Sequence, residues 1–345
     1  MISLNYKTYR INLKYPFGIS RSSNTWYDRL LLSLSSRGHV GYGEAAPNPR
    51  YGENIDQINR VLNSGILLPK NIDTQKRIWN YIKPQLNGIK SLEACFNMAI
   101  WDIWSKMNNI CLSELLDLDS TKKLQTSYTI SLGTQSEILK KIEDSKEYNI
   151  LKVKLGSDKR DKAIFRKIRS HTDKLIRVDA NEGWDIDTAF EMSKWLADKN
   201  VEFIEQPFPA NEIKNTYELK KTSNLPIIAD ENSISSNDIP LIHEAFDGIN
   251  IKLMKCGSIE EALSMIKIAR EYDLKIMLGC MVETSLGISA VSNLIGEVDY
   301  ADLDGNLLIN NDPFKGVQVV DGFLELSKSH GVGAILNQNK ENILI

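Results

Sequence analysis

The chain has 345 residues, of which 42% are hydrophobic and 25% are charged, and its formal net charge is −3. This composition is typical of a folded globular protein and excludes an intrinsically disordered or collagen-like chain. Because there is no basic excess, nucleic acid and membrane surfaces are not expected partners. The length leaves room for one large domain and a smaller one.

The four cysteines are Cys95, Cys111, Cys256 and Cys280, and none of them forms a CxxC pair. Neither a disulfide framework nor a structural zinc site is therefore expected. Residues 1–18 lack the apolar core of roughly 7–15 residues that a secretory signal needs. No apolar run reaches the roughly 18 residues of a membrane span, so we expect a cytoplasmic location.

Residues 1–122 predict an antiparallel sheet followed by helices, an α+β module. Alternating apolar residues, with a turn at Gly38-His39, predict strands over 2–13, 29–35 and 40–44. Polar segments at 16–27 and 47–54 predict two loops between these elements. The stretch 55–118 has helical apolar spacing, which is clearest from Leu92 to Met107.

From about residue 124, short β-branched runs alternate with amphipathic stretches of about 12 residues. The runs lie at 127–131, 151–155, 176–179, 203–205, 227–230, 249–253, 276–279 and 300–304. Repeated βα units indicate a parallel sheet, and eight strands at a steady repeat predict its closure into a TIM-type barrel. The predicted fold class is α/β, with the barrel over residues 123–322.

A charged residue recurs at the end of five successive predicted strands, at intervals of about 25 residues. These residues are Lys154, Asp179, Glu205, Asp230 and Lys252. Since one βα unit has about that length, they occupy equivalent points and share the C-terminal rim of the barrel, where catalytic groups lie. The alternative is that each aspartate caps a helix, but neither glutamate nor lysine is a favoured N-cap.

Three carboxylates on adjacent strands form an all-oxygen, negatively charged site. Asp179, Glu205 and Asp230 therefore predict a hard divalent cation, one Mg²⁺ per subunit, for which Mn²⁺ is a possible substitute. No Cys/His cluster lies nearby to indicate zinc.

The two lysines lie on strands that face each other across an eight-stranded barrel, on either side of the three carboxylates. Bases on opposite faces of one carbon suit removal and return of a proton with inversion, so Lys154 and Lys252 predict an epimerase. Lys152 is two residues from Lys154 and points the same way.

Asp302 and Asp304 are likewise two residues apart, at the end of the eighth predicted strand. Two like charges in one barrel mouth repel each other unless a cation lies between them, which indicates a cationic group on the substrate. The alternative is a capping and turn role before Gly305.

Six segments occur in the order and spacing of a known family: Gly41-Tyr-Gly-Glu44, Leu151-Lys-Val-Lys154, Val178-Asp-Ala-Asn181, Ile204-Glu-Gln-Pro207, Ala229-Asp-Glu231 and Asn250-Ile-Lys-Leu-Met-Lys255. The chain resembles the muconate-lactonizing subgroup of the enolase superfamily along nearly its whole length. This resemblance implies an α+β capping domain over 1–122, joined by the C-terminal tail 323–345, and a modified barrel. It also implies Mg²⁺ on the three carboxylates, the two lysines as acid and base, an enediolate, and contact of Lys152 with the substrate carboxylate.

Within that family, Asp302-Leu303-Asp304 and Gly279-Cys-Met-Val-Glu-Thr284 are similar to the dipeptide epimerases. There the Asp-x-Asp pair binds the α-ammonium of the dipeptide. The resemblance therefore implies inversion of the C-terminal α-carbon of L-Ala-L-Xaa dipeptides. By position, the residues lining the dipeptide would be Cys280, Met281, Val282 and Thr129.

Side-chain selectivity depends on the first capping loop, where the Ala-Glu members carry an arginine. Arg21 falls one place early when counted from Pro16-Phe17, and Ser22 takes the position. With Trp26 and Tyr27 nearby, this favours a hydrophobic, aromatic or broad preference.

Three alternatives stay open. They are an L-Ala-D/L-Glu epimerase of murein peptide recycling, a lyase of the o-succinylbenzoate synthase or muconate cycloisomerase type, and a non-catalytic barrel that binds a metal–carboxylate ligand. The sequence also leaves open the oligomeric state, a homo-oligomer included.

Overall fold

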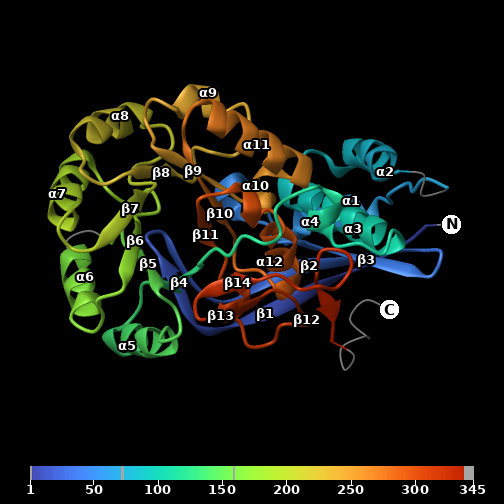
Figure 1. The fold of residues 1–345 in the computed structure, drawn as a ribbon, viewed down its shortest axis with the longest axis horizontal. Coiled ribbons are helices and arrows are strands. Elements are labelled where there is room, and N and C mark those ends of the chain that lie inside the picture. The colour runs from blue at the N-terminus through green and yellow to red at the C-terminus, as the bar shows by residue number, and fades with distance from the viewer. Residues whose placement is uncertain (1, 71–73, 158–159, 338–345) are drawn as a thin grey trace.

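Apolar and polar alternation in the N-terminal segment produces a three-stranded antiparallel sheet (Figure 1). The structure, a computed structural model, describes residues 2–70, 74–157 and 160–337. The strands are β1 (Ser3–Ile19), β2 (Ser22–Ser36) and β3 (His39–Ala45). The second connection is a two-residue turn at Arg37 and Gly38, one residue before the predicted position at Gly38-His39, and the φ angles of its two residues are 50° and 80°. Left-handed conformation at both central residues suits the right-handed twist of a two-residue hairpin.

The first predicted loop, residues 16–27, is instead a β-hairpin. The ladder of β1 and β2 is irregular between Asn12 and Phe17 and then resumes, pairing Phe17 with Asn24 and Ile19 with Ser22. The segment is polar because it extends beyond the sheet core, so composition alone predicted a loop. We call residues 16–27 the hairpin.

Helices cover one face of this sheet and the second predicted loop contains a short 3₁₀ helix. These elements are η1 (Pro49–Tyr51), α1 (Ile55–Asn63), α2 (Gln75–Ile82), η2 (Lys83–Leu86), α3 (Lys90–Met107) and α4 (Leu112–Leu115). Gly43 lets α3 approach closely, because a Cβ at this position would lie 2.0 Å from the carbonyl oxygen of Cys95. The glycines of the Gly41–Glu44 segment thus serve packing between strand and helix.

The eight predicted barrel strands are all present and follow one another in a parallel sheet of sequential order (Figure 1). They are β4 (Ser127–Ile130), β5 (Ile150–Lys154), β6 (Leu175–Asp179), β7 (Val201–Glu205), β8 (Ile227–Ala229), β9 (Gly248–Ile251), β10 (Lys275–Gly279) and β11 (Tyr300–Asp302). The intervening helices are α5 (Gln135–Asp144), α6 (Asp161–Arg169), α7 (Ile186–Leu196), α8 (Ile213–Thr222), α9 (Ile239–Ile242), α10 (Leu253–Cys256), α11 (Ile259–Glu271), α12 (Ser285–Ser292) and η4 (Ile295–Glu297).

Side chains complete the barrel between its first and last strands. A single backbone bridge joins Thr126 to Ala301, and the Ser127 hydroxyl donates to Asp302 Oδ1 at 2.5 Å. The backbone N–H of Thr129 donates to Asp304 Oδ2 at 2.6 Å. The carboxylates after β11 therefore join the two edges of the sheet.

The C-terminal part forms η5 (Gly305–Leu308) and four short strands, β12 (Phe314–Lys315), β13 (Gln318–Val320), β14 (Phe323–Glu325) and β15 (Ile335–Leu336). Its backbone returns to the N-terminal unit: Gly331 bonds with Ile110 and Leu112, and the N–H of Val332 donates to Asp102. Of the tail expected to join that unit, residues 338–345 lie outside the described residues.

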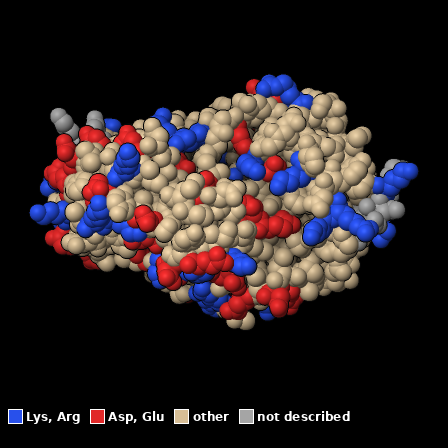
Figure 2. All heavy atoms as spheres, turned by 90° about the horizontal axis from the view of Figure 1, so that it is seen from above, with Lys and Arg blue, Asp and Glu red and all other residues tan. Residues whose placement is uncertain are grey.

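Within the described ranges, no helix combines the length and apolar character required to cross a membrane. Figure 2 shows acidic and basic side chains interspersed on the face seen from above, with uncharged surface between them.

Gly43→Ala should destabilise the fold, because the new methyl group would overlap the backbone of α3. We expect the free energy of unfolding to fall by about 3 kcal/mol, the upper range for overpacked sites. Urea denaturation followed by circular dichroism measures it. His39→Ala, on the partly exposed start of the same strand, is the control, and equal stability of the two variants would contradict this packing role.

Candidate active site

The barrel repeat places three carboxylates together at one rim, as the sequence predicts. Asp179 ends β6, Glu205 ends β7, and Asp230 directly follows β8. One oxygen of each lies within 4.8 Å of the others, and all three residues are buried. The same side of adjacent parallel strands therefore carries a concentrated negative charge.

The predicted lysines surround this group. Lys154 Nζ lies 2.6 Å from Asp179 Oδ2, and Lys252 Nζ lies 2.6 Å from Asp230 Oδ2. Lys252 begins the turn after β9 instead of lying in the strand, as an extended residue before α10. Since β5 and β9 are separated by three strands on either path around the barrel, the two ammonium groups approach the carboxylates from opposite sides.

Lys152 is buried among the carboxylates. Its Nζ is 2.6 Å from Asp302 Oδ2, 2.7 Å from Glu205 Oε2 and 3.1 Å from Asp179 Oδ2. Burial alone would lower the pKa of this lysine, but the surrounding carboxylates, Asp302 foremost, hold it well above its usual range. Lys152 thus remains charged and offsets the repulsion among the acids.

The carboxylates differ in how well they are compensated. Burial opposes ionisation of Asp179, but Lys154 and Lys152 lower its pKa to about 2. Burial and the neighbouring charge of Asp179 instead raise the pKa of Glu205 to about 7. Glu205 is therefore the member of the group with the strongest need for a further cation.

The donor set fits a divalent cation. Glu205 Oε2 is buried and, among the described residues, accepts no aligned hydrogen bond, although the Lys152 ammonium is near. Its other oxygen accepts from Asn250 Nδ2 at 2.9 Å, which fixes the orientation of the carboxylate. Three buried carboxylates at strand ends, one with an oxygen that has no aligned donor among the described residues, match the oxygen ligands that Mg²⁺ prefers.

Lys255 and Asn250 support the carboxylates, although the sequence pattern predicts no role for either residue. Lys255 Nζ lies 2.6 Å from both Asp230 Oδ1 and the Asp230 carbonyl oxygen, and 2.9 Å from the Asn250 carbonyl. Lys255 and Lys252 therefore hold different oxygens of one carboxylate. The Asn-x-Lys-x-x-Lys spacing carried this signal, since Lys255 lies one helical turn beyond Lys252.

Asp302 and Asp304 lie at the same rim, but they already bond to the protein. Asp302 contacts Lys152 and Ser127, and Asp304 accepts from Thr129. Burial first, and then the charge of Asp302, raise the pKa of Asp304 to about 7. Asp304 is thus the acid of this pair with unmet demand for a positive charge. It follows β11 instead of lying in it, because the strand ends at Asp302.

The tip of the hairpin extends to the barrel rim. Arg21 Nη2 lies 2.8 Å from Glu231 Oε1, and Arg21 Nη1 donates to the carbonyl of Asn181 at 2.8 Å. Ser20 Oγ donates to the same carbonyl. The arginine expected in this loop is therefore bound to the barrel's own acceptors.

The second loop of the N-terminal unit, residues 47–54, also contacts the segment that follows β6. Arg50 donates from Nε and Nη2 to the two oxygens of Glu182, at 2.6 Å each. Glu182 also lies 3.4 Å from Arg21 Nη1. Two arginines from separate loops thus meet the segment after β6. The sequence pattern includes Glu231 in a family segment but predicts no role for either Glu231 or Glu182.

The remaining predicted lining residues occupy two environments. Thr129 is buried beside Asp304, and the Cys280 thiol contacts the carbonyl of Asp302. Met281 Sδ accepts from Asn48 Nδ2 in the second loop, at 3.6 Å. Val282 instead packs into an apolar cluster with residues of β1.

The two aromatic residues of the hairpin, Trp26 and Tyr27, lie in different environments. The Trp26 side chain is exposed, with the Arg10 guanidinium 3.6 Å from its ring centroid. Tyr27 packs against the apolar cluster that contains Val282.

Family models match both units of the chain. The Mandelate racemase / muconate lactonizing enzyme N-terminal domain matches residues 1–117, and the Enolase C-terminal domain-like family matches residues 137–340. The chain is 36% identical to an L-Ala-D/L-Glu epimerase of Bacteroides thetaiotaomicron, over 97% of this chain and 88% of the relative. It is 33% identical to an L-Ala-D/L-amino acid epimerase of Flavobacterium johnsoniae, over 97% of this chain and all of the relative.

A solved structure agrees with these matches. The crystal structure of a dipeptide epimerase from Cytophaga hutchinsonii, complexed with Mg and the dipeptide D-Ala-L-Val, superposes with a TM-score of 0.91 at 26% identity. The comparison covers 100% of this chain and 98% of that one. The fold, the two family matches and the curated relatives agree: the chain belongs to the enolase superfamily, in the mandelate racemase and muconate lactonizing enzyme family.

Proposed function

We propose that this chain is a Mg²⁺-dependent dipeptide epimerase that inverts the α-carbon of the C-terminal residue. The single observation that carries the proposal is the pair Lys154 and Lys252, which approach one buried group of carboxylates from opposite sides. Two facing bases are of little use to a protein that only binds a ligand. Relatives that align over nearly the whole chain bear the names of epimerases acting on dipeptides.

Asp179, Glu205 and Asp230 would hold the metal, and Lys152 would contact the substrate carboxylate. When bound, Mg²⁺ would act as a Lewis acid that favours negative charge on the carboxylate oxygens of the substrate. One of the two lysines, as a neutral amine, takes the α-proton and becomes an ammonium, and the other, as an ammonium, gives a proton from the opposite face and becomes the amine.

The substrate ammonium belongs at the pair Asp302 and Asp304. Since Lys152 already compensates Asp302, the charge demand is greatest at Asp304, which Thr129 holds in place. Substrates whose amine is blocked, or that are purely anionic, would leave this acid uncompensated. The arrangement therefore favours a free N-terminal amine, as in a dipeptide.

The preferred second residue is hydrophobic, aromatic or broad in type. Arg21 is bound to Glu231 and to the Asn181 carbonyl, so its guanidinium is already compensated and is not left to attract an acidic side chain.

Replacing either lysine tests the two-base assignment. Lys154→Ala and Lys252→Ala should each reduce epimerisation of L-Ala-L-Phe at least about 100-fold, the usual contribution of a positioned acid or base. Each variant should still exchange the α-proton of the one epimer that faces the remaining lysine. NMR in D₂O measures both rates, with the exposed Lys146→Ala as control. Full epimerisation by either variant would exclude this pair of bases.

Metal removal tests the role of the carboxylates. Incubation with a chelator should abolish α-proton exchange, and Mg²⁺ should restore it, with Mn²⁺ as an effective substitute. Circular dichroism should show little loss of structure, because Lys152 and Lys154 neutralise the acids without the metal. Undiminished exchange in the chelated protein would contradict the assignment.

Arg21→Met tests the side-chain preference. We expect the ratio of kcat/KM for L-Ala-L-Phe over L-Ala-L-Glu to change less than about threefold, because Arg21 bonds to the barrel. A selective loss of more than tenfold with L-Ala-L-Glu would instead assign Arg21 to an acidic substrate side chain. Polarimetry on both dipeptides gives the two values.

A further inference from the structure

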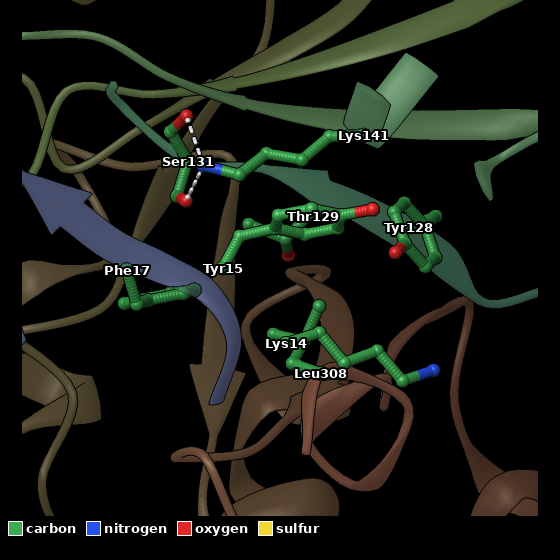
Figure 3. A pocket seen from close by; sticks show the side chains of 8 residues that line it. All are labelled: Lys14, Tyr15, Phe17, Tyr128, Thr129, Ser131, Lys141 and Leu308. Atoms are coloured by element: carbon green, nitrogen blue, oxygen red, sulfur yellow. Dashed lines mark hydrogen bonds between the residues drawn. The ribbon is translucent and has the colours of Figure 1, made fainter. Parts of the chain in front are cut away.

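A buried lysine outside the carboxylate group has no role in the proposed chemistry. Lys141 lies on α5, outside the barrel, and only 3% of it is exposed. Figure 3 shows its side chain extending along a small cavity towards Ser131, with Tyr15 and Phe17 nearby. Burial lowers the pKa of Lys141 to about 8. Keeping an ammonium at such a place costs free energy, which calls for a compensating role.

The ammonium joins two parts of the molecule. Its Nζ lies 2.7 Å from Ser131 Oγ and 3.2 Å from the Ser131 carbonyl, just after β4. It also donates to the carbonyl of Pro16 in the hairpin, at 3.2 Å. Within the described residues, these acceptors are all neutral and no carboxylate lies within ion-pair distance of Lys141. The lysine therefore serves as a buried donor to both units.

Backbone contacts extend this junction. The N–H of Leu132 donates to the carbonyl of Gly18 at 2.9 Å, and Ser131 Oγ approaches the Pro16 carbonyl at 3.4 Å. The hairpin is thus held to the barrel on both sides of Phe17.

From this junction the hairpin runs to its tip at the rim, where Ser20 and Arg21 bond to the Asn181 carbonyl. It is therefore fixed at two places, one beside β4 and one beside β6. Of these two attachments, the one at the tip is open to solvent, because the Arg21 side chain is partly exposed, whereas Lys141 is buried. Loss of the Lys141 contacts would leave the hairpin attached through its tip, the Leu132–Gly18 backbone bond and its own sheet.

We propose that Lys141 is a positioning residue that anchors the hairpin over the active site and thereby sets the affinity for the substrate. This inference rests on the proposed function for its substrate, although the anchoring itself does not. If the hairpin is closed in only a tenth of the molecules, the apparent affinity falls tenfold, since only the closed form binds productively.

The test compares Lys141→Met with Lys140→Met, which replaces the exposed neighbour on the same helix. Lys141→Met should raise KM for L-Ala-L-Phe about tenfold and change kcat less than threefold. Hydrogen exchange of the amides of residues 17–22, read by mass spectrometry without substrate, should accelerate about tenfold, while amides of the barrel strands keep their rates. Lys140→Met should match the wild type in all three measurements.

Ser131→Ala provides a milder variant should Lys141→Met fold poorly. It removes the shortest contact of the ammonium and should raise both KM and hairpin exchange about threefold. Unchanged KM and hairpin exchange in these variants would overturn the proposal, as would uniform acceleration of exchange across the barrel. If the wild type epimerises no dipeptide, the proposed function fails, and the exchange measurement still decides whether Lys141 anchors the hairpin.

Discussion

The site depends on one geometric constraint: parallel strands in a barrel present their carboxyl ends at a single rim. Asp179, Glu205 and Asp230 lie about 25 residues apart along the chain, yet their oxygens lie within 4.8 Å. Such proximity of buried like charges is tolerated only with compensation. Four lysines supply it: Lys152 and Lys154 from β5, and Lys252 and Lys255 from the turn and short helix α10 after β9.

The lysines do not neutralise the three carboxylates equally, and this difference indicates which carboxylate most needs a metal ion. Asp230 contacts two ammonium groups, whereas Glu205 has an oxygen without an aligned donor among the described residues. A divalent cation at Glu205 would offset the burial and the repulsion by Asp179 that together raise the pKa of this carboxyl. It would also compete with the lysines for the carboxylates, so that the lysines could turn towards a substrate. The lysines and carboxylates that form ion pairs with one another in this structure are thus the same side chains that the proposed reaction uses.

Most of the barrel could be predicted from the sequence, because most strands are short apolar runs and most intervening helices are amphipathic. The three carboxylates of the expected metal site could be predicted for the same reason, because residues one βα unit apart in the sequence lie at equivalent positions on the barrel rim. The hairpin could not, because a ladder of polar residues such as Ser22 and Asn24 has no apolar alternation to mark it as a strand. Contacts between distant loops, such as Arg50 with Glu182, also leave no local pattern.

The sequence spacing of Asp302 and Asp304 predicted their position at the barrel rim, but it did not reveal all of their contacts. Their alternation predicted two acids at the rim, and the structure places both there. Asp302 and Asp304 also bond to Ser127 and to the Thr129 N–H, beside the isolated backbone bridge that joins β11 to Thr126, the residue before β4. A substrate ammonium at Asp304 would therefore act on a group that helps to close the barrel. Binding at this point would strengthen the junction of the first and last strands, beside the place where Lys141 and Ser131 hold the hairpin.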